Sequence, residues 1–386
     1  MTMKTNRVYL DYSATTPMAE EAIEAMLPFF RQEFGNPSSI HRFGQYAEAA
    51  LEEAREVIAN HLNCSVEEII FTSGGTESDN LALRGVAFAR REKSGANHIL
   101  ISAVEHHAIS HTAAQLAKNF GFDLEILPVD TYGRVDPDLV RQRLHSNTAL
   151  VSVIYANNEI GTVNPIPEIG EICRENGIPF HTDAVQATPY LTLDVQHLKV
   201  DLLSLGAHKF YGPKGIGVLY VRKGTPILPC QTGGGQEGGL RSGTQNVPYI
   251  VGMSQALKFV QKNQAQWNGS LPILRDWLIE RVRQKIPNSA LTGHPTQRLP
   301  NHASFVFEAV DSQKLLTLLD IEGFACSSGS ACKTGSPSPS EVLLALGFSR
   351  NLALGSLRVT LGKDTTAEHL ESFFNCLIDK IEILRG

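Results

Sequence analysis

The sequence predicts an α/β protein in which a mostly parallel, seven-stranded sheet forms a large domain and a smaller α+β domain follows it. Two patterns predict this fold class. Between residues 68 and 221, short apolar segments alternate with helix-like segments, as in sheets covered by helices on both faces. After about Pro248 the order changes to long helical segments with isolated strands. The 386 residues are enough for one large and one smaller domain.

The N-terminal elements precede the sheet. A short apolar start at residues 8–10 leads into a turn-rich segment at 11–18. Helices are expected at 19–34 and 45–62, where apolar residues recur at helical spacing, and the loop GNPSS separates them.

The sheet region follows in order. Its expected strands are 68–74, 98–104, 124–129, 149–155, 178–184, 201–205 and 216–221. Its expected helices are 77–93, 108–119, 137–143 and 167–176. Ligands in such sheets bind beyond the carboxyl ends of the strands, so functional residues are expected there.

The C-terminal region is expected to form the smaller domain. Its predicted helices are 249–266, 272–285, 312–322 and 367–384; its strands are 303–307 and 356–361; and a Gly/Ser-rich loop covers 327–340.

Composition narrows the classes of function. The net charge is −6 and no basic block is present, which argues against a nucleic-acid partner. No apolar run has the length of a signal peptide or a membrane span, so no membrane association is expected. Six cysteines in a chain of this length suit a reducing compartment, and we expect a cytoplasmic protein.

The segment SLGAHKFYGPKGIG places Lys209 on a short, glycine-rich connection between two apolar strands. Desolvation in such a position lowers the pKa of a lysine, and a lysine with a depressed pKa can form a Schiff base with a carbonyl. The alternative is an ordinary solvated lysine near a turn.

AHKFYGPKGIG resembles the lysine segment of the NifS/IscS cysteine desulfurases, which belong to the class V aminotransferase family. The resemblance extends from YLDYSATTP, which begins at Tyr9, to SLRVTLG, which ends at Gly362. It implies the fold-type I architecture of pyridoxal 5′-phosphate (PLP) enzymes, with the cofactor as a Schiff base on Lys209. It further implies a large cofactor domain at 15–258 and a small domain at 1–14 and 259–386.

The resemblance assigns further residues to the cofactor. They are Gly75, Thr76, His106, Asn158, Asp183, Gln186, His208 and Thr244. Gly75 and Thr76 open a helix whose free amides suit a phosphate, although Gly-Gly-Thr is also a plain helix-start turn. Asp183 ends a strand, where a carboxylate can pair with a protonated pyridine nitrogen or simply cap the next turn. Thr244, in a glycine-dense loop, is implied to reach the phosphate of the other subunit of a homodimer.

The resemblance also implies roles in catalysis. His106 stacks on the cofactor ring and works as acid and base. Arg358 and Asn158 bind the substrate, L-cysteine, which becomes L-alanine. Cys332 takes the sulfur as a persulfide and passes it to acceptor or scaffold proteins of iron–sulfur cluster assembly. Cys326 is a rival sulfur, for which a buried structural role is the alternative.

Other interpretations stay open from the sequence alone. A selenocysteine lyase or another class V aminotransferase is the enzymatic alternative, and a docking platform for iron–sulfur assembly proteins is the non-enzymatic one. His106, His107 and His111 offer three imidazoles, but they lack an HExxH order or a nearby Cys/Asp cluster, so no metal site is expected.

The sequence departs from the family pattern at two places. Gly206 stands where family members commonly have a serine that helps bind phosphate, so one hydrogen bond is expected to be missing. The chain ends at Gly386, directly after the last expected helix, whereas members that dock an iron–sulfur scaffold carry a longer tail. The resemblance therefore does not imply delivery to such a scaffold by the usual contact.

Overall fold

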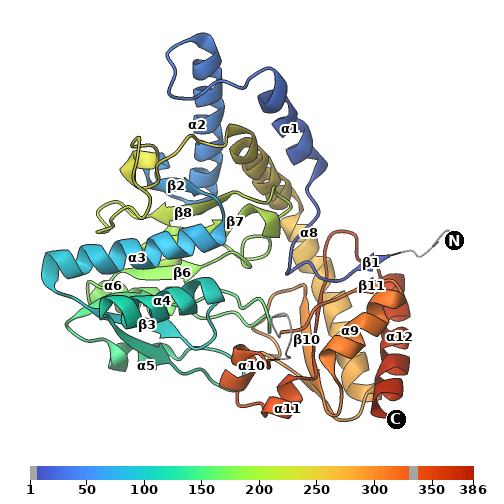
Figure 1. Ribbon diagram of the computed structural model, residues 1–386. Coiled ribbons are helices and arrows are strands. Elements are labelled where there is room, and N and C mark those ends of the chain that lie inside the picture. Colours follow the sequence, from blue (N-terminus) through green and yellow to red (C-terminus); the bar gives the residue numbers. More distant parts are fainter. Residues whose placement is uncertain (1–6, 330–337) are drawn as a thin grey trace.

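The computed structural model describes residues 7–329 and 338–386 (Figure 1). Its central sheet has seven strands in the order β2-β8-β7-β6-β5-β3-β4. They are β2 (Ile69–Thr72), β3 (His98–Ser102), β4 (Asp123–Leu127), β5 (Thr148–Ser152), β6 (Phe180–Asp183), β7 (Leu202–Gly206) and β8 (Gly217–Val221). Only β8 runs antiparallel to its neighbours in this sheet. The predicted fold class, with a mostly parallel sheet of seven strands, is confirmed.

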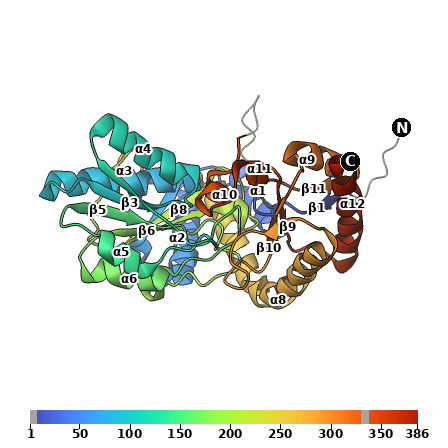
Figure 2. The same ribbon diagram turned by 90° about the horizontal axis from the view of Figure 1, so that it is seen from below.

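Helices cover both faces of this sheet (Figure 2). On one face lie α3 (Gly75–Ser94) and α4 (His107–Phe120), and on the other α5 (Pro137–Arg143) and α6 (Ile166–Glu175). Every residue of β3, β5 and β7 is buried, as expected of parallel strands packed on both sides.

The turn between β7 and β8 holds the predicted lysine. One turn of 3₁₀ helix, η2 (Ala207–Lys209), follows β7 directly, and the chain then returns as β8. Because Ala207 is fully buried and β7 pairs with β8 over its whole length, this turn is held rigidly.

Two smaller sheets lie beside the central one. The antiparallel sheet has the order β12-β10-β9 and consists of β9 (Ser289–Leu291), β10 (His302–Phe307) and β12 (Ser356–Thr360). The N-terminal strand β1 (Val8–Tyr9) pairs in parallel with β11 (Phe324–Ala325). Residues 8 and 9 therefore lie against the last quarter of the chain, where α9 (Ser312–Ile321) and α12 (Ala367–Arg385) flank these sheets.

A single helix, α8 (Val247–Lys285), replaces the two helices predicted at 249–266 and 272–285. Trp267 and Leu271, in the expected gap, are buried, and this packing keeps the segment helical despite Pro272 in the helix interior. The predicted domain boundary at residue 258 falls inside this helix, and the division into domains stays a prediction.

Two more helices, α1 (Glu20–Arg31) and α2 (Arg42–Leu62), pack against α8. Short helical segments are η1 (Val66–Glu68), α7 (Val195–Leu198), η3 (Glu237–Gly239), α10 (Glu341–Ala345) and α11 (Arg350–Ala353).

Candidate active site

A cavity of about 240 Å³ lies at the carboxyl ends of the parallel strands. Its lining residues are Gly75, Thr76, Asp79, His106, Ile154, Asn158, Asp183, Val185, Gln186, His208 and Lys209. Eight of these are residues that the sequence assigned to the cofactor. They meet here because the segments after β2, β3, β5, β6 and β7 converge at one edge of the sheet.

Lys209 reaches into the cavity with its ammonium group held by backbone. Its Nζ donates hydrogen bonds to the carbonyl oxygens of Ser13, at 2.6 Å, and Ala14, at 2.7 Å. Burial, followed by the positive charge of Arg358, lowers the pKa of Lys209 to about 8. A substantial fraction of this amine is therefore neutral and nucleophilic near physiological pH.

Two buried carboxyl groups, those of Asp183 and Asp79, line the cavity. Asp183 is the last residue of β6, and one of its carboxylate oxygens accepts a hydrogen bond from Val185 N at 2.9 Å. Asp79 projects from α3, and its Oδ1 has no hydrogen-bond partner among the described residues. Burial raises the pKa of both carboxyl groups, and their mutual repulsion raises that of Asp79 further. The pair leaves a place for a cationic group in the cavity.

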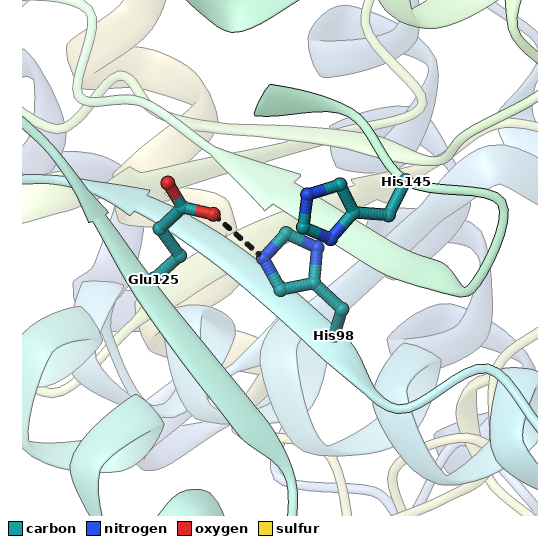
Figure 3. Close-up of side chains that lie close together, drawn as sticks. All are labelled: His98, Glu125 and His145. Atoms are coloured by element: carbon teal, nitrogen blue, oxygen red, sulfur yellow. Dashed lines mark ion pairs between the residues drawn. The ribbon is translucent and has the colours of Figure 1, made fainter. Parts of the chain in front are cut away.

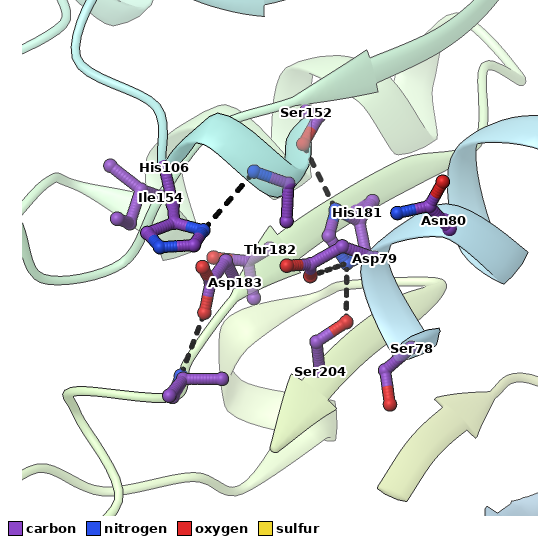
Figure 4. A network of polar contacts seen from close by, with 12 residues as sticks. Ser78, Asp79, Asn80, His106, Ser152, Ile154, His181, Thr182, Asp183 and Ser204 are labelled. Carbon is purple, nitrogen blue, oxygen red and sulfur yellow. Dashed lines mark hydrogen bonds and ion pairs between the residues drawn. The ribbon is translucent and has the colours of Figure 1, made fainter. Parts of the chain in front are cut away.

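A polar network beneath the cavity holds these groups in place (Figure 4). The ring of His181 bonds to Ser152 Oγ and Ser204 Oγ, both at 2.9 Å, and its Nε2 lies 3.7 Å from Asp79 Oδ1. Burial lowers the pKa of His181 to about 3, so this ring is neutral and acts through hydrogen bonds.

His106 caps the start of α4 at the mouth of the cavity. Its Nδ1 accepts a hydrogen bond from Ala108 N at 3.1 Å. In the neutral ring the proton therefore lies on Nε2, and Figure 4 shows the ring close to the Asp183 carboxylate. The cap fixes the ring orientation and leaves one nitrogen free for proton transfer.

The N-terminus of α3 forms a narrow part of the cavity wall. A Cβ atom at Gly75 would lie 2.7 Å from Val185 Cγ2, so a glycine is needed for this close approach. Gly206 faces the same place, and a Cβ there would lie 3.4 Å from Gly75 N and 3.5 Å from Val185 Cγ1, both ordinary contacts. The structure therefore has room for the side chain that Gly206 lacks.

The remaining lining residues are tied to the N-terminal segment. Gln186 Nε2 donates to Ser13 O at 2.8 Å, and His208 Nδ1 lies 3.2 Å from Thr15 Oγ1. Burial and the nearby positive charge of Lys209 lower the pKa of His208 to about 4, so its ring is neutral.

Arg358 lies on β12 and is not among the residues that line the cavity. Its guanidinium pairs with Asp11 at 2.8 Å and donates to the backbone oxygen of Asn158 at 3.0 Å. Its buried Nε has no hydrogen-bond partner among the described residues. Arg358 is thus linked to the backbone of Asn158, and the assignment of both residues to the substrate stays a prediction.

Two sequence-predicted groups do not line the cavity, and a third, Cys332, falls outside the described residues. Cys326 is partly buried next to β11, and burial raises the pKa of its thiol well above the ordinary value, which makes it a poor nucleophile. Thr244 is exposed on its loop and does not line the cavity of its own chain.

Sequence reasoning missed several groups at the site. Asp79 is the most important, and its spacing with Leu83 and Val86 on α3 was a signal that it faces the core. Glu105 is fully buried beside the cavity wall, where burial raises its pKa to about 8. The carbonyl groups of Ser13 and Ala14 carry no side-chain signal and could not be found from sequence.

Comparisons with a family model and with curated proteins identify the same family. The class-V aminotransferase family model matches residues 8–373. The cysteine desulfurase IscS of Methanosarcina thermophila is 48% identical over 379 residues, covering 98% of this chain and 93% of that protein.

Solved structures agree. A NifS-like protein aligns with a TM-score of 0.91 and 35% identity, covering 98% of this chain and all of that one. The structure titled SspA in complex with cysteine aligns with a TM-score of 0.79 and 36% identity over 92% of this chain and 98% of that one. None of the helices in the described parts of the chain combines the length and apolarity that crossing a membrane requires.

Proposed function

Because the chain belongs to the class-V aminotransferase family, and within it to the PLP-dependent cysteine desulfurases, we propose that Lys209 carries the cofactor and Cys332 the sulfur. The observation that carries this proposal is the convergence of Lys209, Asp183 and His106 on one cavity. PLP, when bound, supplies an electron sink for the carbon skeleton of an amino acid.

The residues of the cavity fit PLP. Lys209 offers a neutral amine for its aldehyde, and the amide groups at the start of α3 offer donors for its phosphate. Asp183 and Asp79 form a buried carboxyl pair whose pKa values burial raises, and a protonated pyridine nitrogen beside Asp183 would stabilise its ionised form. We assign Gln186 and Asn158 to the polar edge of the ring, and His208 to the phosphate.

The substrate is proposed to be L-cysteine. Arg358 is assigned to its carboxylate because the free Nε of that guanidinium needs an acceptor, and arginine pairs bidentately with carboxylates. With PLP bound, the Lys209 amine would move the proton at the substrate Cα. His106 Nε2 serves as the second proton-transfer group, since its other nitrogen is occupied by the helix cap.

The sulfur transfer is proposed to occur at Cys332. Its thiolate attacks the substrate sulfur, an S–S bond forms, and the Cβ–S bond of the substrate breaks with its electron pair left on carbon. That carbon takes up a proton and leaves as L-alanine, while Cys332 keeps a persulfide. We propose iron–sulfur cluster assembly as the process that consumes this sulfur, through an acceptor thiol.

Two further features support proposals about the cellular compartment and the oligomeric state. The five described cysteines are free thiols, which supports a reducing, cytoplasmic compartment. Apolar side chains at the end of α1 and the start of α2 are exposed, which supports a homodimer.

The cofactor assignment is tested by borohydride reduction of the holoenzyme followed by peptide mapping. The pyridoxyl group is expected on Lys209. The matched control is Lys214 in the same peptide, and a label there would overturn the assignment.

The sulfur assignment is tested by alanine release from cysteine. Cys332→Ala should keep the cofactor spectrum and bind cysteine but release no alanine under reducing turnover. Cys326→Ala is the matched control and should behave as the parent, because its thiol is partly buried and poorly ionised. Normal turnover by Cys332→Ala would contradict the proposal and favour a lyase or aminotransferase activity.

A further inference from the structure

A second polar cluster lies near the start of β3, and none of its residues lines the cavity (Figure 3). His98 is the first residue of β3, Glu125 lies on β4, and His145 precedes β5. One ligand atom from each of these three side chains lies within 4.8 Å of the other two. None of the three residues takes part in the proposed chemistry at Lys209.

The distance between His98 and Glu125 suits a shared cation better than a direct hydrogen bond. His98 Nε2 lies 3.4 Å from Glu125 Oε2, and this fully buried nitrogen has no hydrogen-bond partner among the described residues. A good N–H···O bond is about 2.9 Å long. Two ligands placed about 2.0–2.1 Å from one zinc ion at a tetrahedral angle lie roughly 3.3 Å apart.

The outer contacts of His98 and Glu125 orient both groups toward the centre of the cluster. His98 Nδ1 lies 2.9 Å from Thr148 Oγ1, which also accepts a hydrogen bond from His145 N at 2.8 Å. In the tautomer with its proton on Nδ1, the lone pair of His98 Nε2 faces the carboxylate. Arg143 Nη1 donates to Glu125 Oε1 at 2.8 Å, which leaves Oε2 free. Such outer partners are typical of metal-binding histidines and carboxylates.

His145 completes the set from the solvent side. Its ring stacks on that of His98 with centroids 4.5 Å apart, and its side chain is exposed, so its ring can adjust to an ion without disturbing the core. Two imidazoles and one carboxylate are a common ligand set for zinc, with water in the fourth position. Magnesium and calcium prefer oxygen ligands and do not suit it.

We propose that His98, Glu125 and His145 form a zinc-binding site that joins β3, β4 and the connection to β5. The proposal is independent of the function assigned to Lys209 and Cys332. Because the ion would bind only when these three segments are folded together, zinc should stabilise the native chain.

The test is a zinc titration of the full-length protein with its thiols alkylated beforehand, so that cysteines do not compete. A chromogenic chelator reports stoichiometry and affinity, and thermal unfolding is recorded in parallel. We expect one zinc ion per chain and a rise in the unfolding temperature. His145→Ala, which alters an exposed residue, and Glu125→Gln should each weaken zinc binding at least about 100-fold and abolish the thermal shift.

Two variants serve as controls. His197→Ala removes an exposed histidine outside the cluster and should bind zinc as the parent does. His111→Ala tests the other close histidine pair, since the ring of His111 lies 4.6 Å from that of His107. Unchanged zinc binding by His145→Ala, its loss in His111→Ala alone, or no zinc bound by the parent would each overturn the proposal.

Discussion

At the scale of single residues, the site depends on ionisable groups whose pKa values are shifted by burial. Lys209 is the clearest case, because its amine is desolvated and lies near the Arg358 cation, while the carbonyl groups of Ser13 and Ala14 hold its position. Reactivity and placement thus come from different parts of the chain.

The pKa of Lys209 sets a pH dependence for cofactor attachment. Below about pH 8 the amine is protonated and cannot attack the aldehyde; above it the amine is neutral. The rate at which PLP attaches to the cofactor-free protein should therefore rise with pH and level off above about pH 8. Stopped-flow absorbance checks this, with a model lysine amide as the control, whose rate should still rise near pH 10. A protein profile that follows the model amide would contradict the pKa assignment.

Gly206 gives a prediction about cofactor affinity. Its backbone is extended, at φ −136° and ψ 116°, and a Cβ there meets only ordinary contacts, so serine should fit. Gly206→Ser should hold PLP about 10- to 100-fold more tightly, because a hydroxyl bond to a charged group contributes about 1.5–3 kcal/mol.

The control for that experiment is Gly206→Ala, which fills the same space without a hydroxyl. Equilibrium dialysis of PLP from all three proteins compares them. Equal affinities for the serine and alanine variants would show that the hydroxyl contributes nothing.

Sequence reasoning found the site residues that follow strands and missed those that depend on tertiary contact. Asp183 ends a strand, and Lys209 and His106 follow within a few residues of one, so the chain order predicts that they meet at one edge of the sheet. Asp11 pairs with Arg358 across 347 positions, and no local pattern encodes such a contact. Asp79 was missed because it looked like one more charge on an amphipathic helix.

At the scale of elements, one buried ion pair anchors the glycine-rich loop that carries Thr244. The Glu237 carboxylate accepts from Arg55 Nη1 at 2.9 Å, Arg55 Nη2 at 3.1 Å and Phe71 N at 3.0 Å. These bonds tie the loop to α2 and β2. Glu237 holds a left-handed backbone, with φ at +51°, and this side-chain network fixes that conformation.

Removing this charge should be costly. Glu237→Gln removes the buried carboxylate that faces the Arg55 guanidinium, whose other carboxylate partner, Glu52 at 3.2 Å, is half-exposed, so we expect a loss of on the order of 3 kcal/mol in the free energy of unfolding. Glu175→Gln is the control, because it breaks the half-exposed pair with Arg141 and should cost less than about 1 kcal/mol. Thermal unfolding of both variants checks the contrast, and equal shifts would show that Glu237 is not the anchor.

The strands of the central sheet were predictable because each is a short apolar run with a turn on either side. The continuity of α8 was not, since Gly269, Ser270 and Pro272 together read as a break. The buried Trp267 and Leu271 outweigh that local preference. The two-residue strands β1 and β11 were too short to show the alternation of apolar and polar residues that marks a strand.

At the scale of the whole molecule, an apolar surface at the end of α1 and the start of α2 is open to solvent. Ile40 is 93% exposed and Phe34 68%, and the rings of Phe34 and Phe43 lie 5.6 Å apart. A surface of this kind is typical of a contact with another chain.

This surface predicts the residues that hold the proposed homodimer together. Ile40→Asp combined with Phe43→Asp should give a monomer in light scattering and weaken PLP binding, because the partner's loop is lost. Ile383→Asp, which changes a side chain that is 65% exposed on α12, is the control and should remain dimeric. A dimeric double variant would place the interface elsewhere.

A shared site makes a separate prediction by complementation. Lys209→Ala and Thr244→Ala chains should each be poor enzymes alone, since one lacks the amine and the other the partner's phosphate contact. In a mixed dimer one site has both groups, so alanine release should recover on mixing after reversible dissociation. No recovery would mean that Thr244 acts within its own chain or not at all.

The N-terminal segment has a consequence for how the protein is made. Ser13 supplies the oxygen that holds Lys209, yet Ser13 N itself bonds to Thr360 Oγ1 at 2.9 Å, and Leu10 O accepts from Thr360 N at 2.8 Å. At translation rates of roughly 5–20 residues per second, the ribosome needs on the order of 20–70 s to travel from Ser13 to Thr360. During that interval the nascent chain can assemble its central sheet, but the cofactor pocket stays open on one side. We therefore expect PLP to load late, once Thr360 has been synthesised and can hold the N-terminal segment.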